Sequence, residues 1–261
     1  MDDAWWGPTV MAPGEEAARM MIVEKSLPGQ LFVNKAGKRF CDEAAPYIEV
    51  VHAMYAANKE GAESVPAYMV YGAEYRKKYP VGPILPGSNQ PDATVPKDLW
   101  DNFVFKANTP EELASKIGVD PANLANSIKK MNEYAVTGID PEFAKGGNEY
   151  DRFYGDEKCT PNPCLARLDP PFYAVKVFAG ELGTKGGLLA DAKARVIDNS
   201  GNIIKGLYAI GNCSSALMGP CYAGAGSTIG PAMTFGYIAA NEIVNPQSAG
   251  ATEKSAAKAE A

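Results

Sequence analysis

A glycine-rich loop followed by a helix is the part of the sequence with the clearest chemical meaning. The loop runs from Tyr222 to Gly226, and apolar residues at helical spacing predict a helix from about Ser227 to Val244. A Gly-x-Gly loop lets the backbone approach a ligand closely, and the N–H groups that open a helix suit an anionic or electron-rich atom. The glycines are not spaced as Gly-x-Gly-x-x-Gly, however, so tight helix–strand packing remains an alternative to a ligand site.

The other residues that could carry chemistry are few. His52 is the single histidine, so a Ser-His-Asp hydrolase would have to use it, and a zinc site built from several histidines is impossible. The five cysteines contain no Cys-x-x-Cys pair and are interpreted as reduced thiols, with Cys213 and Cys221 as small buried ones. We therefore expect no metal site.

Net charge and the chain ends exclude further classes of function. A net charge of −6 leaves no basic surface pattern typical of nucleic-acid or anionic-membrane binding. No apolar stretch is long enough to span a bilayer, and the first residues do not read as a signal peptide. We therefore expect a cytoplasmic protein.

Several elements are expected to position the glycine-rich loop. A strand is predicted at Tyr173–Phe178, and a hairpin turn at Asp198–Gly201 between the strands 194–197 and 203–204. A short buried strand at Gly206–Asn212 is expected before the loop. The final helix should bury one face, formed by Ile229, Met233, Gly236, Ala240 and Ile243.

The middle of the chain predicts two capped helices. Thr109-Pro110-Glu111-Glu112 is a capping box, and Asp120-Pro121 starts a second helix that carries Leu124, Ile128 and Met131 at helical spacing. Strands are predicted at 30–34, 38–40 and 68–71, and Arg39 is interpreted as a surface residue near the turn between the first two.

Two stretches of the C-terminal part resemble a known family. Gly206-Leu-Tyr-Ala-Ile-Gly-Asn212 and Tyr222-Ala-Gly-Ala-Gly-Ser-Thr-Ile-Gly-Pro-Ala-Met-Thr-Phe-Gly236 are similar to the flavin-binding segment of 3-ketosteroid Δ1-dehydrogenases, which belong to the fumarate reductase/succinate dehydrogenase-like flavoproteins. The resemblance extends in a consistent order over nearly all of residues 1–245. It includes residues 1–8, 37–47, 163–164, 171–177 and 182–187.

The resemblance implies an α/β fold in which a partial, Rossmann-like FAD-binding domain carries an inserted α+β catalytic (cap) domain. Residues 1–21 and 166–246 would belong to the flavin domain, 22–165 would form the cap, and 247–261 are expected to be a disordered tail. Nothing in the chain matches the Gly-x-Gly-x-x-Gly turn of the family's N-terminal half. The chain therefore resembles the C-terminal half alone, as a truncated form or with a separate N-terminal FAD-binding half as partner.

The resemblance also implies a reaction and its residues. FAD-dependent 1,2-dehydrogenation of a 3-ketosteroid moves a proton from C2 to a base and a hydride to the flavin. The family pattern makes Tyr47 the base, and it assigns the grip on the C3 ketone to the Tyr222 hydroxyl and the Gly226 N–H. An ordinary tyrosine has a pKa near 10, so ionising Tyr47 at neutral pH costs about 4 kcal/mol that its surroundings must offset.

The cofactor contacts implied by the resemblance lie on both sides of the loop. Gly211 and Asn212 would lie beside the ribityl chain or pyrophosphate of FAD. Ser227, Thr228 and Ile229 would direct their N–H groups at the pyrimidine edge of the flavin ring, where a helix N-terminus stabilises negative charge.

Three other functions remain open from the sequence. The chain could be a fumarate reductase-like or other FAD-dependent dehydrogenase, although the loop has no cation and so favours an uncharged ketone. It could desaturate the 4,5-bond of a steroid instead of the 1,2-bond. It could also be a non-catalytic fragment that needs a separate N-terminal half.

Overall fold

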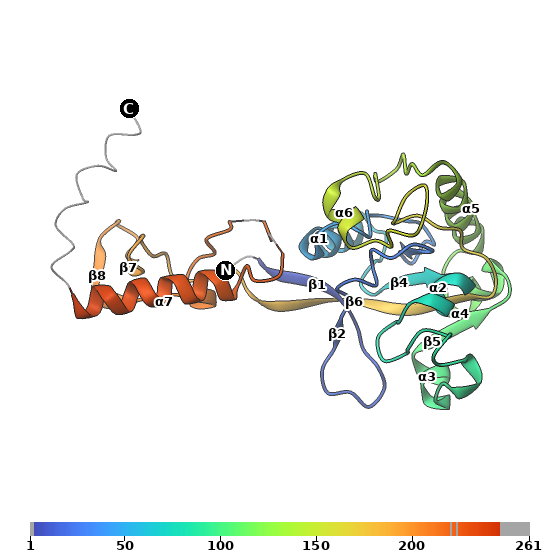
Figure 1. Cartoon of the computed structure of the whole chain (residues 1–261), viewed down its shortest axis with the longest axis horizontal. Coiled ribbons are helices and arrows are strands. Elements are labelled where there is room, and N and C mark those ends of the chain that lie inside the picture. The colour runs from blue at the N-terminus through green and yellow to red at the C-terminus, as the bar shows by residue number, and fades with distance from the viewer. Residues whose placement is uncertain (1–2, 220, 223, 246–261) are drawn as a thin grey trace. The chain divides into compact units, whose positions relative to one another are not determined.

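The computed structural model describes residues 3–219, 221–222 and 224–245. The chain divides into two compact units (Figure 1). We call Trp6–Glu181 the sheet unit, and Met1–Trp5 together with Leu182–Ala261 the C-terminal unit. Each unit contains both helices and strands, which confirms the mixed α/β class.

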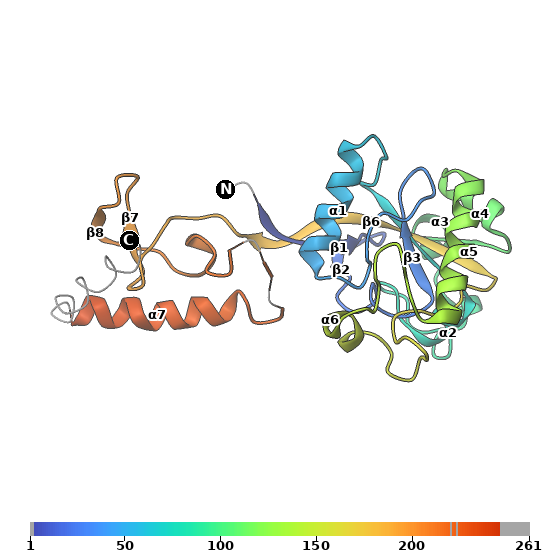
Figure 2. The same cartoon turned by 90° about the horizontal axis from the view of Figure 1, so that it is seen from above.

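A six-stranded sheet forms the centre of the sheet unit (Figure 2). The order is β2-β1-β6-β4-β3, with β5 paired to β6, and β3, β4, β5 and β6 pair antiparallel. The strands are β1 (Ala4–Val10), β2 (Arg19–Met20), β3 (Gln30–Val33), β4 (Ala67–Tyr71), β5 (Val104–Ala107) and β6 (Phe172–Thr184). The predicted strands at 30–34, 68–71 and 173–178 are therefore confirmed, whereas 38–40 is not a strand.

Side chains alternate between the two faces of this sheet along each strand, and apolar clusters bury both faces. In β3, Phe32 packs into one apolar cluster, with Val50, Val51 and Met54 of α1 (Tyr47–Lys59). Its neighbours Leu31 and Val33 pack into a second cluster with α4 (Pro110–Ile117) and α5 (Pro121–Thr137). The result is an α+β unit with helices on both faces of an antiparallel sheet.

The two predicted helices form with the expected caps. The Thr109 hydroxyl accepts the Glu112 N–H at 3.1 Å, and the Asp120 carboxylate accepts the Asn123 N–H at 2.8 Å. Both helices end at a left-handed glycine, Gly118 or Gly138, a conformation in which a Cβ would be strained. The unit also contains α2 (Ala73–Lys78), η1 (Asp92–Thr94), α3 (Lys97–Asn102) and α6 (Glu149–Phe153).

The C-terminal unit contains a hairpin and one long helix. Strands β7 (Arg195–Ile197) and β8 (Ile203–Tyr208) pair antiparallel around the predicted turn, and η2 (Gly211–Cys213) precedes α7 (Ile229–Val244). Asp198 closes the turn by accepting the N–H groups of Ser200 and Asn202, both at 2.8 Å.

Burial in this unit differs from the prediction. The strand predicted at Gly206–Asn212 is confirmed only for Gly206–Tyr208, within β8, and its predicted burial is wrong because β8 is largely exposed. The face of α7 predicted to be buried is also exposed, with Ile229 at 63%, Met233 at 69% and Ile243 at 59%. Within the described residues, the unit places too few side chains over this helix to cover it.

The two units do not divide where the sequence-based domains do. The boundaries between the two units fall within β1 and near the end of β6. The predicted domain boundaries lie instead at 21/22 and 165/166. The predicted domain limits therefore stay a prediction. The tail predicted at 247–261 lies outside the described residues.

Within the described ranges, no helix combines the length and the apolar character needed to cross a membrane. The expected cytoplasmic location stays a prediction.

Candidate functional site

A cavity of about 220 Å³ lies within the C-terminal unit. It brings together Gly211 and Asn212 of η2 with Ser227 and Thr228 at the start of α7, four of the five residues predicted to bind the cofactor. The fifth, Ile229, is exposed and does not line it. Small-molecule pockets usually begin at about 300 Å³, so this cavity has the size for one part of a large cofactor.

The helix end at the cavity carries a partial positive charge. α7 begins without a side-chain cap on its backbone N–H groups. Its first turn includes Pro231, which has no N–H, and the Gly230 N–H bonds to the Gly226 carbonyl at 2.8 Å. The Ser227 hydroxyl donates to the Gly224 carbonyl at 2.7 Å and so fixes the loop before the helix.

Tyr222 and Gly226, the predicted ketone clamp, lie beside this cavity rather than in its lining. The Tyr222 ring packs on Trp5 with 5.4 Å between ring centroids, and Trp5 is a buried wall of the cavity. Gly226 has a φ of +97°, and no described atom lies within 4 Å of the point where a Cβ would stand. Its backbone is therefore open to approach.

Lys185 is a residue that the sequence analysis missed at this site. It lines the cavity, forms an ion pair with Asp3, and its Nζ lies 5.6 Å from the Trp5 ring centroid. The loop itself contains no cation, but Lys185 brings one to the cavity from outside the loop. Only the fold could reveal this, because Lys185 is far from the glycine-rich loop in sequence.

The cavity fits a planar cofactor with one polar edge. Apolar walls come from Trp5, Leu189, Leu217, Met218 and Phe235. Polar groups converge from η2 and the α7 N-terminus, where Thr184 also donates to the Asn212 carbonyl at 3.2 Å. Apolar walls with a few polar groups suit a flavin ring, and the positive helix end would stabilise its reduced, negatively charged form.

Tyr47, the predicted base, lies in the sheet unit as the first residue of α1. Pro46 precedes it and fixes the backbone where the helix starts, and the ring is almost completely buried. The sequence analysis did not predict this helix, because three β-branched residues in its first turn and a half lower helix propensity. His52 lies on the exposed side of the same helix.

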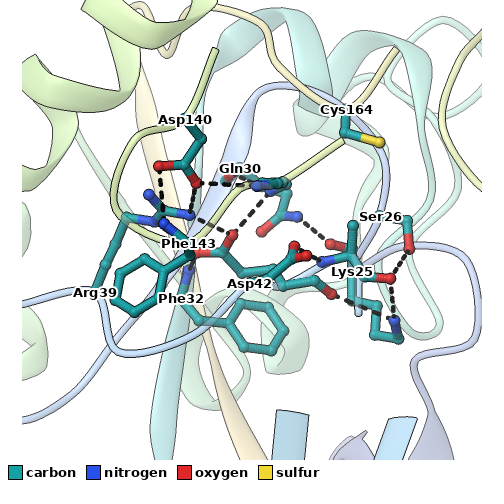
Figure 3. Close-up of polar contacts among 12 residues, drawn as sticks. Lys25, Ser26, Gln30, Phe32, Arg39, Asp42, Asp140, Phe143 and Cys164 are labelled. Carbon is teal, nitrogen blue, oxygen red and sulfur yellow. Dashed lines mark hydrogen bonds and ion pairs between the residues drawn. The ribbon is translucent and has the colours of Figure 1, made fainter. Parts of the chain in front are cut away.

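A cluster of buried charges that was also not predicted includes Lys25, whose Nζ lies 5.3 Å from the centroid of the Tyr47 ring. Figure 3 shows this cluster. Arg39 pairs with Glu43 at 2.9 Å and with Asp140 at 2.9 Å, while Lys145 pairs with Glu43 at 3.1 Å. The Arg39 side chain is only 2% exposed, so its interpretation as a surface residue is wrong. Arg39 and Asp140 lie at one end of the cluster and Lys25 lies at the other.

Burial and pairing shift the pKa values of this cluster in opposite directions. Burial alone would raise the pKa of Glu43, but Arg39 and Lys145 outweigh it and lower that pKa to about 2. Burial, and next the charge of Asp151, raise the pKa of Asp42 to about 7. Burial lowers the pKa of Lys25 to about 8. Near neutral pH, Asp42 is thus partly protonated beside a charged Lys25.

The remaining groups that could react or bind a metal are the cysteines and the clusters of His, Cys, Asp and Glu side chains. All five cysteines are free thiols; Cys41 and Cys164 are buried, but Cys213 and Cys221 are exposed, so their predicted burial is wrong. In residues 3–219, 221–222 and 224–245, no group of three or more His, Cys, Asp or Glu side chains could hold a metal ion.

An apolar cavity at a helix N-terminus, with directed polar groups, defines a site for part of a nucleotide-type cofactor. A family model described as "FAD binding domain" matches residues 1–229, and the chain belongs to this family. The predicted cofactor is thereby confirmed as that of the family. The roles of Tyr47, Tyr222, Gly226 and the five cofactor-binding residues stay predictions.

Individual relatives agree with the resemblance found in the sequence. The chain is 42% identical to "3-oxosteroid 1-dehydrogenase" of Mycolicibacterium smegmatis over 93% of its own length. It is similar to the crystal structure of 3-ketosteroid delta1-dehydrogenase from Sterolibacterium denitrificans in complex with 1,4-androstadiene-3,17-dione, with 49% identity and a TM-score of 0.87 over 92% of the chain. A "4-oxocyclohexanecarboxylate 2-dehydrogenase" of Sinomonas cyclohexanicum is 35% identical over 98% of the chain. The chain spans 42%, 43% and 44% of these three proteins.

Proposed function

We propose that this chain provides the substrate-binding half of an FAD-dependent dehydrogenase that desaturates the 1,2-bond of a 3-ketosteroid. The observation that carries the proposal is the cavity in the C-terminal unit, which joins the α7 N-terminus to Gly211 and Asn212 while Tyr222 packs on its Trp5 wall. The identity to 3-oxosteroid 1-dehydrogenases supports the choice of substrate.

Each proposed residue has a distinct task. The Tyr222 hydroxyl and the Gly226 N–H would donate hydrogen bonds to the C3 carbonyl oxygen, where negative charge develops as the C2 proton leaves. This makes the C2 proton more acidic, and the Tyr47 oxygen would accept it. FAD, when bound, supplies the acceptor for the hydride from C1.

A separate FAD-binding half is proposed as the partner of the C-terminal unit. The chain spans less than half of each relative, and its C-terminal unit exposes many large apolar side chains. Exposure of so many large apolar side chains in one small unit is typical of an interface. We propose that it binds a segment carrying the Gly-x-Gly-x-x-Gly turn for the FAD pyrophosphate, because that turn is absent from this chain.

The test co-expresses the chain with the part of the Mycolicibacterium smegmatis relative that the chain does not match, in the presence of FAD. The proposal expects a yellow complex that converts 4-androstene-3,17-dione into 1,4-androstadiene-3,17-dione, measured by mass and ultraviolet spectrum. A flavin-loaded complex that leaves the steroid unchanged would refute the reaction. A colourless complex would refute the shared cofactor site and favour a non-catalytic chain.

A smaller cyclic ketone is the second candidate substrate. The relative from Sinomonas cyclohexanicum matches almost the whole chain, and its name describes the dehydrogenation of a ring ketone at position 2. The same complex should be assayed with 4-oxocyclohexanecarboxylate and with fumarate in parallel. A higher kcat/KM for either one would replace the steroid as the proposed substrate.

A further inference from the structure

Lys25 makes an unusual set of contacts for a buried lysine. Its side chain is fully buried, and its Nζ donates hydrogen bonds to three successive backbone carbonyls, those of Glu43 at 3.3 Å, Ala44 at 3.2 Å and Ala45. An ammonium has three donors, so these carbonyls use all of them. Figure 3 shows the side chain at the end of the cluster opposite Arg39.

The neighbouring Lys145 shows what a purely structural lysine does here. Lys145 is equally buried, and its ammonium lies 3.1 Å from the Glu43 carboxylate, which balances its charge. Lys25 donates its hydrogen bonds to backbone carbonyls instead, and although the charge of Asp42 favours its ammonium, burial outweighs this and lowers its pKa. Buried charges held without a paired carboxylate are costly and concentrate at functional sites.

The charge of Lys25 acts on Tyr47. Its Nζ lies 5.3 Å from the centroid of the Tyr47 ring, within the range of a cation–π contact, and both side chains are buried. The three carbonyls that Lys25 holds belong to residues 43–45, which lead directly through Pro46 into Tyr47. Tyr47 also opens α1, so the positive end of that helix adds to the charge of Lys25.

We propose that Lys25 is a positioning residue for Tyr47: its ammonium fixes the segment 43–45 that orients the ring and stabilises the ionised phenol. The inference deepens the proposed function, on which the use of Tyr47 as a base rests. It identifies a source for the energy that ionising a tyrosine near neutral pH requires. At low dielectric, a cation at this distance lowers the pKa of a phenol by about one pH unit or more.

Other charges face Lys25 and set the pH range of the effect. The groups that act on its ammonium are Asp42 and Cys41 from the loop before α1, Asp151 from α6, and Lys145. Asp42 is partly protonated near pH 7, which reduces its opposition to an anionic ring. Lys25 loses its own proton near pH 8, so its support for the phenolate is greatest below that pH.

The test follows the phenol of Tyr47 directly in the full chain. The chain is produced with tyrosine labelled with carbon-13 at the ring carbon that carries the hydroxyl, and Tyr47→Phe assigns the Tyr47 signal. We expect the Tyr47 midpoint to lie below about pH 8, where Lys25 is still charged, and therefore well below the ordinary tyrosine value of about 10. In Lys25→Gln the midpoint should rise by about one pH unit or more, and Lys25→Arg should restore it.

Lys145→Gln is the matched control, because it removes a buried lysine from the same cluster whose charge is paired with Glu43. It should lower the stability of the fold and leave the Tyr47 midpoint in place. A wild-type midpoint above about 8 would overturn the inference even if Lys25→Gln does not fold, and so would an unchanged midpoint in a folded Lys25→Gln. The titration needs neither flavin nor steroid, so its outcome is independent of whether the proposed reaction occurs.

Discussion

The two units differ in how far they bury their large apolar side chains. The sheet unit encloses its apolar side chains between helices on both faces of its sheet. Among the described residues, seven large apolar side chains are exposed in the sheet unit and fourteen in the C-terminal unit, although the sheet unit is more than twice as long. The sheet unit therefore has the features of a self-sufficient fold, and the C-terminal unit has those of an interface.

The same contrast holds for polar groups. In the sheet unit, buried charges are joined to one another, as Arg39, Glu43 and Asp140 show. In the C-terminal unit, the polar groups of η2 and of the α7 N-terminus converge on a cavity. Paired charges specify a rigid structure, whereas directed donors around a cavity are available to a ligand. The comparison thus separates the unit that carries the proposed base, Tyr47, from the unit that carries the proposed cofactor cavity.

The largest expected effect tests whether both units contribute to one reaction. In the flavin-loaded complex, Tyr222→Phe should lower kcat by about 10²- to 10³-fold, because it removes the proposed donor to the developing oxyanion. Tyr47→Phe should lower kcat by about 10²- to 10⁴-fold, because it removes the proposed base. Single-turnover flavin reduction measures both, and circular dichroism monitors the fold.

Tyr237→Phe is the control for this pair. Tyr237 is 73% exposed on α7, and its hydroxyl has no proposed role, so turnover should stay at the wild-type level. Turnover close to wild type in both the Tyr47 and the Tyr222 variant would refute the division of labour between the units.

The next effect tests whether the buried charges make the sheet unit rigid. Arg39→Met removes one partner from two buried carboxylates and should lower the free energy of unfolding by about 3–5 kcal/mol. Arg195→Met in the C-terminal unit breaks a more exposed pair with Asp191 and should cost at most about 1 kcal/mol. Urea unfolding measures both values; equal losses would contradict the contrast between the units.

How far the sequence predicts this molecule depends on the range of the interactions involved. The helices capped by Thr109 and Asp120 and the turn at Asp198 follow from contacts within four residues, and all were predicted. The pairing of Arg39 with Asp140 joins residues 101 positions apart, and no local pattern signals it. The spacing of apolar residues, with a period of 3.6, identified the apolar face of α7. Such a pattern does not indicate which surface covers that face.

The candidate site divides in the same way. The glycine-rich loop and the helix N-terminus were visible in the sequence because their chemistry is local. Lys25 and Lys185 were not visible in the sequence. Lys25 lies near Tyr47, and Lys185 lies near Trp5, only because the fold brings them together.

A third prediction uses the pH dependence of the sheet unit. The pKa of Asp42 is raised from 3.8 to about 7 in the folded state, so the folded chain binds a proton more tightly than the unfolded chain. Its contribution is fully present below about pH 4 and is lost as the pH rises to about 7, a change on the order of 4 kcal/mol.

Asp42→Asn isolates this contribution, since the amide oxygen can still accept the Ala44 N–H that Asp42 accepts at 2.8 Å. The stability of the variant minus that of the wild type should increase between pH 4 and pH 7. Urea unfolding at several pH values measures the difference. A difference that does not change with pH would mean that Asp42 titrates normally.

The smallest expected effect compares the ends of two helices, one from each unit. Thr109 accepts an N–H at the start of α4, whereas α7 begins at Thr228 without a side-chain cap. Thr109→Ala should therefore lower the free energy of unfolding by about 1 kcal/mol, and Thr228→Ala should change it by less than about 0.5 kcal/mol. Thermal unfolding of the chain without flavin measures both. If the N–H groups of α7 are kept for a cofactor, added FAD and the N-terminal partner should stabilise the wild-type C-terminal unit, and Thr228→Ala should leave that gain intact because backbone amides supply the contact.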